Sequence, residues 1–155
     1  MALAPWLPTS WTGESPTMST LDAETEGRHR LLLVDPYGTS REGLGAALRD
    51  GGFTVEAAEG SSEAVRMIHD GAFDLAIIDL DLPPAHGLAE DGWELVSLLR
   101  AADPTLALIL IAAECHPDTQ AAAVRLGAAA LLEKPINPRE LRTIVRALRP
   151  EIAPA

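Results

Sequence analysis

Three aspartates and one lysine stand at the ends of aliphatic runs in this sequence. Asp35 ends the run "RLLLVD", Asp79 and Asp81 follow "DLAII", and Lys134 ends "AALLEK". Carboxylates that lie close together repel one another unless a cation sits between them. Mg²⁺ is usually held by one or two carboxylates together with phosphate oxygens and water, and lysine binds phosphate as a point charge. These residue types therefore indicate phosphoryl transfer onto a carboxylate, with a metal and a lysine neutralising the charge.

Each of these residues also has an ordinary structural interpretation. Asp35 alone is typical of a helix cap, Asp79 alone of a residue that orients a loop, and Lys134 alone of a solvated residue before a proline. Their position at the ends of three separate apolar runs favours a common site instead, provided that the runs are strands of one sheet.

Aliphatic runs alternate with amphipathic segments of helical period through most of the chain. The runs predict strands at 30–35, 53–58, 74–80, 106–113 and 129–134. The amphipathic segments predict helices at 39–50, 61–70, 91–102, 117–126 and 137–148. Residues of N-cap type stand at or near the helix starts, namely Ser61, Asp91, Asp118 and Asn137.

This alternation predicts an α/β fold, a doubly wound parallel sheet with helices on both faces. A sheet of five strands in this class most often has the flavodoxin-like order 2-1-3-4-5, with its ligand crevice at the carboxyl ends of strands one and three. Asp35 and Asp79 end those two strands, and Lys134 ends the fifth. The fold therefore predicts that all three side chains lie at one edge of the sheet.

The first 27 residues differ in composition from the rest. They are rich in Pro, Ser and Thr and contain acids but no Lys or Arg, which predicts a disordered tail. Translation from Met1 and from Met18 are both compatible with such a tail. Residues 28–150 are expected to form one compact domain, and residues 151–155 a short tail.

Charge and cysteine content exclude several classes of function. The 155-residue chain has a formal net charge of −11, which argues against a nucleic-acid or anionic-membrane surface. No apolar run approaches the length of a membrane span. Cys115 is the only cysteine, so an intramolecular disulfide is excluded and a cytoplasmic location is expected.

Residues 30–148 resemble the receiver domain of two-component response regulators, which is CheY-like. The resemblance rests on "LLLVD", on "DLAIIDLDLP" and on "LLEKPINPRELRTIVRAL". It implies that Asp79 is the phosphoacceptor and that Lys134 contacts the phosphoryl group. It also implies that Asp35, Asp79 and the backbone carbonyl of Asp81 hold Mg²⁺.

Three positions depart from the pattern that the resemblance implies. The family has a second acid after strand one that binds the metal directly, and here that position is Pro36. The family's Ser or Thr at the end of strand four is Ala112, and its switching aromatic on strand five is Leu131. These departures predict a degenerate site with weakened Mg²⁺ binding, for which the Asp81 carboxylate is a candidate substitute ligand.

The segment "PPAHGLAEDG" (83–92) is longer than the family's loop by about five residues, a tolerated insertion by loop-length expectations. Either Gly87 or Gly92 is a candidate for the family's turn glycine. A loop beside the acceptor is suited to gating access or to presenting a partner surface, and an insertion without function is an equal alternative.

The resemblance implies a histidine kinase or phosphotransfer protein as phosphoryl donor and a downstream protein as target. Only "PEIAPA" follows the last helical segment, which predicts a stand-alone module that signals by protein–protein contact. No enzymatic activity is expected beyond self-phosphorylation and self-dephosphorylation at Asp79. The fourth helix, fifth strand and fifth helix are the surface that the family uses for output and for homodimers.

Two alternatives remain open at the level of the sequence. The first is a pseudo-receiver that binds partners without being phosphorylated. The second is a phosphatase with an aspartate nucleophile, because "DLDLP" is similar to the D-x-D-x-T signature of haloacid-dehalogenase-type enzymes. Pro83 stands where that signature has Thr, which weakens the second alternative.

Overall fold

The structure is a computed structural model that describes residues 29–83 and 91–148. The predicted tails, both candidate start methionines and Gly87 therefore lie outside the described residues, as does most of the 83–92 loop. Within the described ranges, strands and helices alternate without exception.

The described strands form one parallel sheet with the order β2-β1-β3-β4-β5. This order confirms the predicted flavodoxin-like topology. The strands are β1 (Arg30–Val34), β2 (Thr54–Ala58), β3 (Leu75–Asp79), β4 (Ala107–Ala112) and β5 (Ala130–Glu133). Each lies inside its predicted run and is one or two residues shorter.

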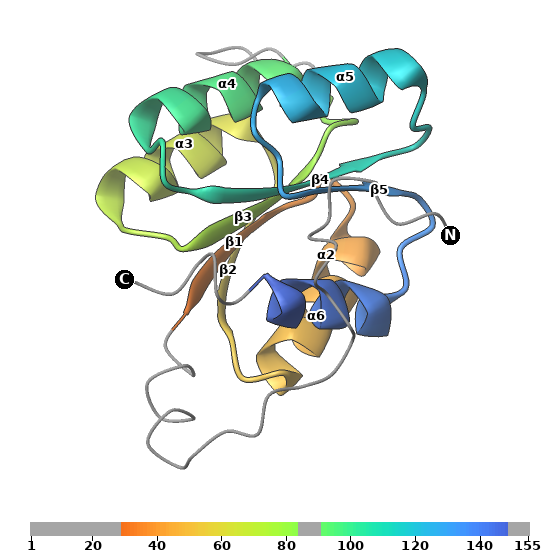
Figure 1. Ribbon diagram of the computed structural model, residues 1–155. Coiled ribbons are helices and arrows are strands. Elements are labelled where there is room, and N and C mark those ends of the chain that lie inside the picture. The colour runs from red at the N-terminus through yellow and green to blue at the C-terminus, as the bar shows by residue number, and fades with distance from the viewer. Residues whose placement is uncertain (1–28, 84–90, 149–155) are drawn as a thin grey trace.

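Helices cover both faces of this sheet. They are α2 (Gly38–Asp50), α3 (Ser61–Asp70), α4 (Gly92–Ala102), α5 (Pro117–Arg125) and α6 (Pro138–Ala147). Figure 1 shows α3, α4 and α5 on one face and α2 and α6 on the other. None of the helices in the described ranges is long and apolar enough to cross a membrane.

The apolar runs are continuous because the strands are buried on both faces. In β1, Leu32 and Val34 belong to the hydrophobic cluster beneath α3, α4 and α5. Leu31 and Leu33 belong to the opposite cluster, which includes core residues of α2 and α6. Successive side chains of a strand point to opposite faces, so each run must be apolar at every position to supply both clusters.

Two of the predicted N-caps are confirmed and two are wrong. The Asp91 carboxylate accepts a hydrogen bond from Glu94 N, and the Asn137 side chain accepts one from Arg139 N. Ser61 is instead the first residue of α3, because extended Gly60 takes the cap position. Asp118 lies inside the first turn of α5, since the helix already begins at Pro117.

Candidate functional site

The carboxyl ends of β1 and β3 each bring a buried aspartate to the same edge of the sheet. Asp35 and Asp79 are both 3% exposed. Register places Val34 beside Ile78, so the two aspartates follow paired strand positions. The proximity of Asp35 is one cause that raises the pKa of Asp79. The predicted convergence of these two carboxylates is therefore seen in the structure.

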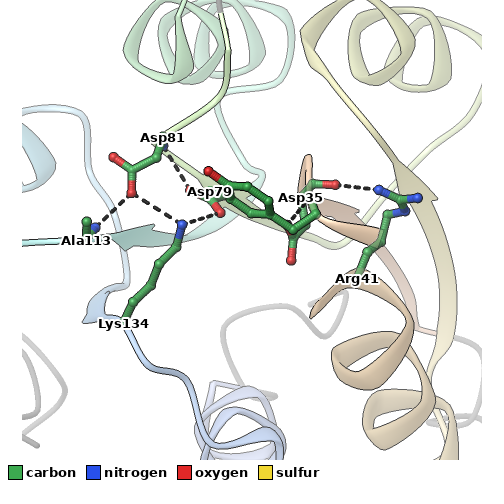
Figure 2. A network of polar contacts seen from close by, with 7 residues as sticks. Asp35, Arg41, Asp79, Asp81, Ala113 and Lys134 are labelled. Carbon is green, nitrogen blue, oxygen red and sulfur yellow. Dashed lines mark hydrogen bonds and ion pairs between the residues drawn. The ribbon is translucent and has the colours of Figure 1, made fainter. Parts of the chain in front are cut away.

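Lys134 forms ion pairs with two aspartates at this edge of the sheet. It follows β5, and its backbone N–H donates to Ala112 O at the end of β4, which fixes the start of the side chain. Its ammonium lies 2.7 Å from Asp79 Oδ2 and 3.3 Å from Asp81 Oδ2 (Figure 2). The peptide bond between Lys134 and Pro135 is cis. The lysine thus bridges two carboxylates, one of which is buried.

Burial and charge act in opposite directions on Asp79. Burial is the main cause that raises its pKa above the ordinary value of 3.8, and repulsion from Asp35 adds to the increase. The hydrogen bond from Lys134 and the one from Asp81 N oppose the increase without cancelling it. Asp79 is therefore a carboxylate whose negative charge is poorly stabilised until a further cation or hydrogen-bond donor is supplied.

The ammonium of Lys134 is subject to the opposite balance. Burial lowers its pKa, but the hydrogen bonds and charges of Asp79 and Asp81 outweigh burial and raise the pKa above 10.5. The ring of Tyr37 also faces the ammonium, with its centroid 5.1 Å from Nζ. Lys134 is thus held in its cationic form at the edge of the sheet.

The Asp35 carboxylate is anchored by its own backbone turn. Its Oδ1 accepts from Tyr37 N at 2.8 Å, and its carbonyl oxygen accepts from Arg41 Nη1 at 2.9 Å. Asp35 is therefore not the side-chain cap of α2, because Tyr37 is the N-cap residue and α2 has no side-chain cap hydrogen bond. Pro36 lies between them and provides neither an N–H nor a side-chain oxygen.

The Asp81 side chain points away from Asp35. Its Oδ2 accepts from Ala113 N at 2.8 Å besides pairing with Lys134. Figure 2 shows Asp81 and Asp35 on opposite sides of Asp79. The carboxylate of Asp81 therefore lies on the side of Lys134 in this structure. Its role as a substitute metal ligand stays a prediction.

The donor set at this edge is suited to a hard cation. Carboxylate oxygens of Asp35 and Asp79 and the backbone carbonyl of Asp81 are the ligand type that Mg²⁺ prefers. No group of three or more His, Cys, Asp or Glu side chains in the described ranges is gathered to hold a metal. A cation here would depend on two carboxylates, a carbonyl and water.

A cleft of about 840 Å³ opens beside the aspartates. Asp35, Asp79 and Lys134 are among the residues that line it. Leu44 of α2 and Ile136 before α6 are among its apolar lining residues. The cleft gives a reactant access to the otherwise buried Asp79.

Ala112 and Leu131, the two predicted departures at the switch positions, are both buried. Ala112 is 5% and Leu131 is 3% exposed, and both belong to the cluster beneath α3, α4 and α5. Neither side chain carries a polar group.

The strand-end pattern correctly predicted that Asp35, Asp79 and Lys134 lie at one edge of the sheet. It did not predict the contacts of Asp81 with Ala113 and of Lys134 with Tyr37.

Of the two candidates for the turn glycine in the 83–92 loop, the structure describes only Gly92. Gly92 begins α4, and a Cβ there would lie 2.6 Å from Cα and O of Leu80. A glycine is thus required where α4 approaches the segment after β3. Gly87 lies outside the described residues.

Comparison with known proteins agrees with this geometry. The model of the response regulator receiver domain family matches residues 31–146. A response regulator receiver protein of Anaeromyxobacter sp. is 37% identical over 107 residues, covering 69% of this chain and 43% of that protein. The alginate biosynthesis transcriptional regulatory protein AlgB of Pseudomonas syringae pv. tomato is 30% identical over 122 residues, covering 79% of this chain and 26% of AlgB. The chain therefore spans less than half of these relatives.

Solved structures extend the similarity to three dimensions. The CheY-like receiver domain protein of Methanospirillum hungatei has a TM-score of 0.72 at 26% identity, covering 80% of this chain and 95% of that one. The chemotaxis protein CheY4 of Vibrio cholerae has a TM-score of 0.68 at 27% identity, covering 78% and 99%. With the sheet order, the paired aspartates and the family match in agreement, the chain belongs to the response regulator receiver domain family of two-component signalling.

Proposed function

We propose that this receiver domain accepts a phosphoryl group on Asp79 and signals through contact with another protein. The observation that carries the proposal is the 2.7 Å pairing of Lys134 Nζ with Oδ2 of the buried Asp79, two residues that line a cleft. This arrangement joins a carboxylate nucleophile to a fixed cation that neutralises charge on a transferred group. The donor would be a histidine kinase, a phosphotransfer protein or a small acyl phosphate.

The reaction is a displacement at phosphorus. An oxygen of ionised Asp79 forms the new P–O bond while the P–N or P–O bond to the donor breaks, and the leaving group takes the electron pair and a proton. Asp79 must be ionised to attack, and its raised pKa means that the neutral form persists to higher pH than for an exposed aspartate. Lys134 remains protonated throughout and offsets charge on the phosphoryl oxygens.

We propose that Asp35, Asp79 and the carbonyl of Asp81 would hold Mg²⁺ when it binds. The ion would supply charge neutralisation at the phosphoryl oxygens. Pro36 removes one acidic ligand from this set, so binding is expected to be weaker than in a site with an acidic pair. We therefore propose an inefficient phosphoacceptor rather than an ordinary one.

The signal is also proposed to be transmitted in an altered way. Ala112 has no hydroxyl to bind a phosphoryl group, and Leu131 has no ring to reorient. Output by the surface of α5, β5 and α6, including homodimer formation, then depends on displacement of the backbone at the end of β4. A pseudo-receiver that acts without phosphate is the second candidate, and Pro36 together with Ala112 is the observation in its favour.

Incubation with acetyl phosphate and Mg²⁺ followed by intact-mass measurement tests the proposal. We expect a mass increase of one phosphoryl group in the wild type, none in Asp79→Asn, and a slower increase in Lys134→Ala. Absence of the increase at millimolar Mg²⁺ would overturn phosphorylation and favour the pseudo-receiver. Turnover of small phosphate esters that requires Asp79 would instead revive the phosphatase alternative.

A further inference from the structure

The partly exposed carboxylate of Asp81 is held by two donors of the sheet edge, a backbone N–H and a lysine ammonium. Its Oδ2 accepts from Ala113 N at 2.8 Å and lies 3.3 Å from Lys134 Nζ. Its own backbone N–H donates to Asp79 Oδ1 at 2.9 Å. The side chain is 41% exposed, so it lies against the edge of the sheet while solvent remains open beside it. Figure 2 shows these contacts as one connected network.

The two donors that hold Asp81 lie beside the proposed acceptor. Lys134 also binds Asp79 Oδ2 at 2.7 Å, and Ala113 directly follows β4, the strand paired with β3. A phosphoryl group on Asp79 would carry its oxygens beyond the carboxylate, toward cations and N–H groups within reach of it. The Lys134 ammonium and the Ala113 N–H are donors of that kind.

We infer that the Asp81 carboxylate is an internal anion that occupies the phosphoryl-binding position and must be displaced for Asp79 to be phosphorylated. This inference rests on the proposed function of Asp79. A backbone N–H has one proton to donate, so an anion that holds Ala113 N excludes a second one. Charge-assisted hydrogen bonds are the strong ones, which makes this occupancy costly to break.

The absence of a hydroxyl at Ala112 makes the phosphoryl group more dependent on the donors that Asp81 occupies. A phosphoryl group at this edge has no side-chain hydroxyl of residue 112 to bind, so it depends on the donors that Asp81 already holds. Asp79 and Asp81 already share the single ammonium of Lys134 at this edge, and Asp35 adds a third negative charge beside Asp79. An incoming phosphoryl group would add further negative charge beside these carboxylates. The resulting repulsion would be relieved if Asp81 turned outward to solvent.

Substitution of Asp81 separates its charge from its shape. Asp81→Asn keeps an oxygen that can accept from Ala113 N but removes the charge that binds Lys134. Asp81→Ala frees both donors. We expect phosphorylation of Asp79 by acetyl phosphate to be about tenfold faster in Asp81→Ala than in the wild type, since one charge-assisted hydrogen bond is worth at least that factor. Asp81→Asn should lie between them.

Asp118→Asn is the matched control, because it removes one negative charge from the exposed first turn of α5. Its labelling rate should equal that of the wild type. Equal or slower labelling in both Asp81 variants than in the wild type would overturn the inference while leaving Asp79 as phosphoacceptor. Labelling that is absent in every variant would overturn the proposed function instead.

A second measurement judges the inference without any covalent step. Inorganic phosphate is titrated into ¹⁵N-labelled wild type and Asp81→Ala, and the amide resonance of Ala113 is followed by NMR. We expect this resonance to shift at about tenfold lower phosphate concentration in the variant, whose dispersed spectrum also verifies folding. The same response in both proteins, including no response, would overturn the inference.

Discussion

The ammonium of Lys134 lies 2.7 Å from Oδ2 of Asp79, yet the pKa of this aspartate is raised rather than lowered. Burial destabilises the ionised form of Asp79 by more than Lys134 stabilises it, and repulsion from Asp35 adds to the destabilisation. The pair therefore does not neutralise the site completely. A residual demand for positive charge at Asp79 is what a receiver site would use to attract a metal ion or to favour transfer of a phosphoryl group.

This imbalance predicts how stability depends on pH. Because the folded protein holds the Asp79 proton more tightly than the unfolded chain, the contribution of Asp79 to stability falls as pH rises from 3.8 through its raised pKa. Asp79→Asn removes that contribution. Urea unfolding at a series of pH values should therefore show the variant gaining stability relative to the wild type as pH rises. A relative gain by the wild type over the same range would contradict the raised pKa of Asp79.

Restoring the missing acid is expected to strengthen metal binding. Pro36→Asp adds a carboxylate next to Asp35, and even indirect partners of metal ligands change affinity by about tenfold or more. We expect Mg²⁺ affinity, measured by titration calorimetry, to rise by at least about tenfold. Pro36→Ala is the control, because it also removes the proline ring but adds no oxygen. An equal gain in both variants would show that backbone freedom, and not the carboxylate, limits binding.

A hydroxyl at the end of β4 is expected to help hold the phosphoryl group. Ala112→Thr and Ala112→Val differ only by a hydroxyl in place of a methyl group, so both introduce the same bulk at this buried position. We expect the phosphorylated fraction of the Thr variant to exceed that of the Val variant by up to about tenfold, as for one charge-assisted hydrogen bond. Intact-mass measurement at matched times after addition of acetyl phosphate decides between them.

Arg100 is expected to stabilise the end of the sheet opposite the site. Its guanidinium donates to the carbonyl oxygens of Leu126, Pro104, Leu106 and Gly127, at 3.0, 2.9, 2.7 and 3.1 Å respectively. It thereby joins the segment before β4 to the segment before β5. Arg100→Met should lower the free energy of unfolding by about 2 kcal/mol, since several donors to carbonyl groups are lost together.

Two further variants sharpen the Arg100 prediction. Arg146→Met removes an exposed guanidinium from α6 and should change stability by less than about 0.5 kcal/mol. Arg100→Lys should recover only part of the loss, because a lysine ammonium cannot reproduce the planar arrangement of donors. Urea unfolding curves of the three variants provide the comparison, and equal losses in Arg100→Met and Arg146→Met would remove the proposed role of Arg100.

The fold was predictable because its signals are local. Continuous apolar runs such as that of β3 specify strands buried on both faces, and strand-end residues such as Asp35 and Lys134 follow from the parallel order. The starts of α3 and α5 were less predictable, since Gly60 and Pro117 moved the cap away from Ser61 and Asp118. Several residue types can begin a helix, and a few tenths of a kcal/mol decide among them.

The contacts at the site were less predictable for a different reason. The direction of the Asp81 side chain depends on Ala113 and Lys134, which are 32 and 53 residues away along the chain. The alternation of a strand does not continue beyond its end, so the spacing of Asp79 and Asp81 in "DLDLP" does not fix which way each carboxylate points. That direction is set by the placement of β4 beside β3 and of β5 beside β4, which brings Ala113 and Lys134 next to Asp81.

The approach of α4 to the segment after β3 yields the last prediction. A Cβ on Gly92 would lie 2.6 Å from Leu80 Cα and O, which are backbone atoms that cannot rotate away. Gly92→Ala should therefore lower the free energy of unfolding by about 2 kcal/mol, as overpacking of a closed contact does. Gly43 provides the matched control, because a Cβ on this residue of α2 would meet nothing within 4 Å. Gly43→Ala should stabilise the protein by about 0.5–1 kcal/mol through helix propensity alone. Opposite signs in urea unfolding would assign the effect to the contact with Leu80, whereas a gain in both variants would show that α4 can withdraw from β3 at little cost.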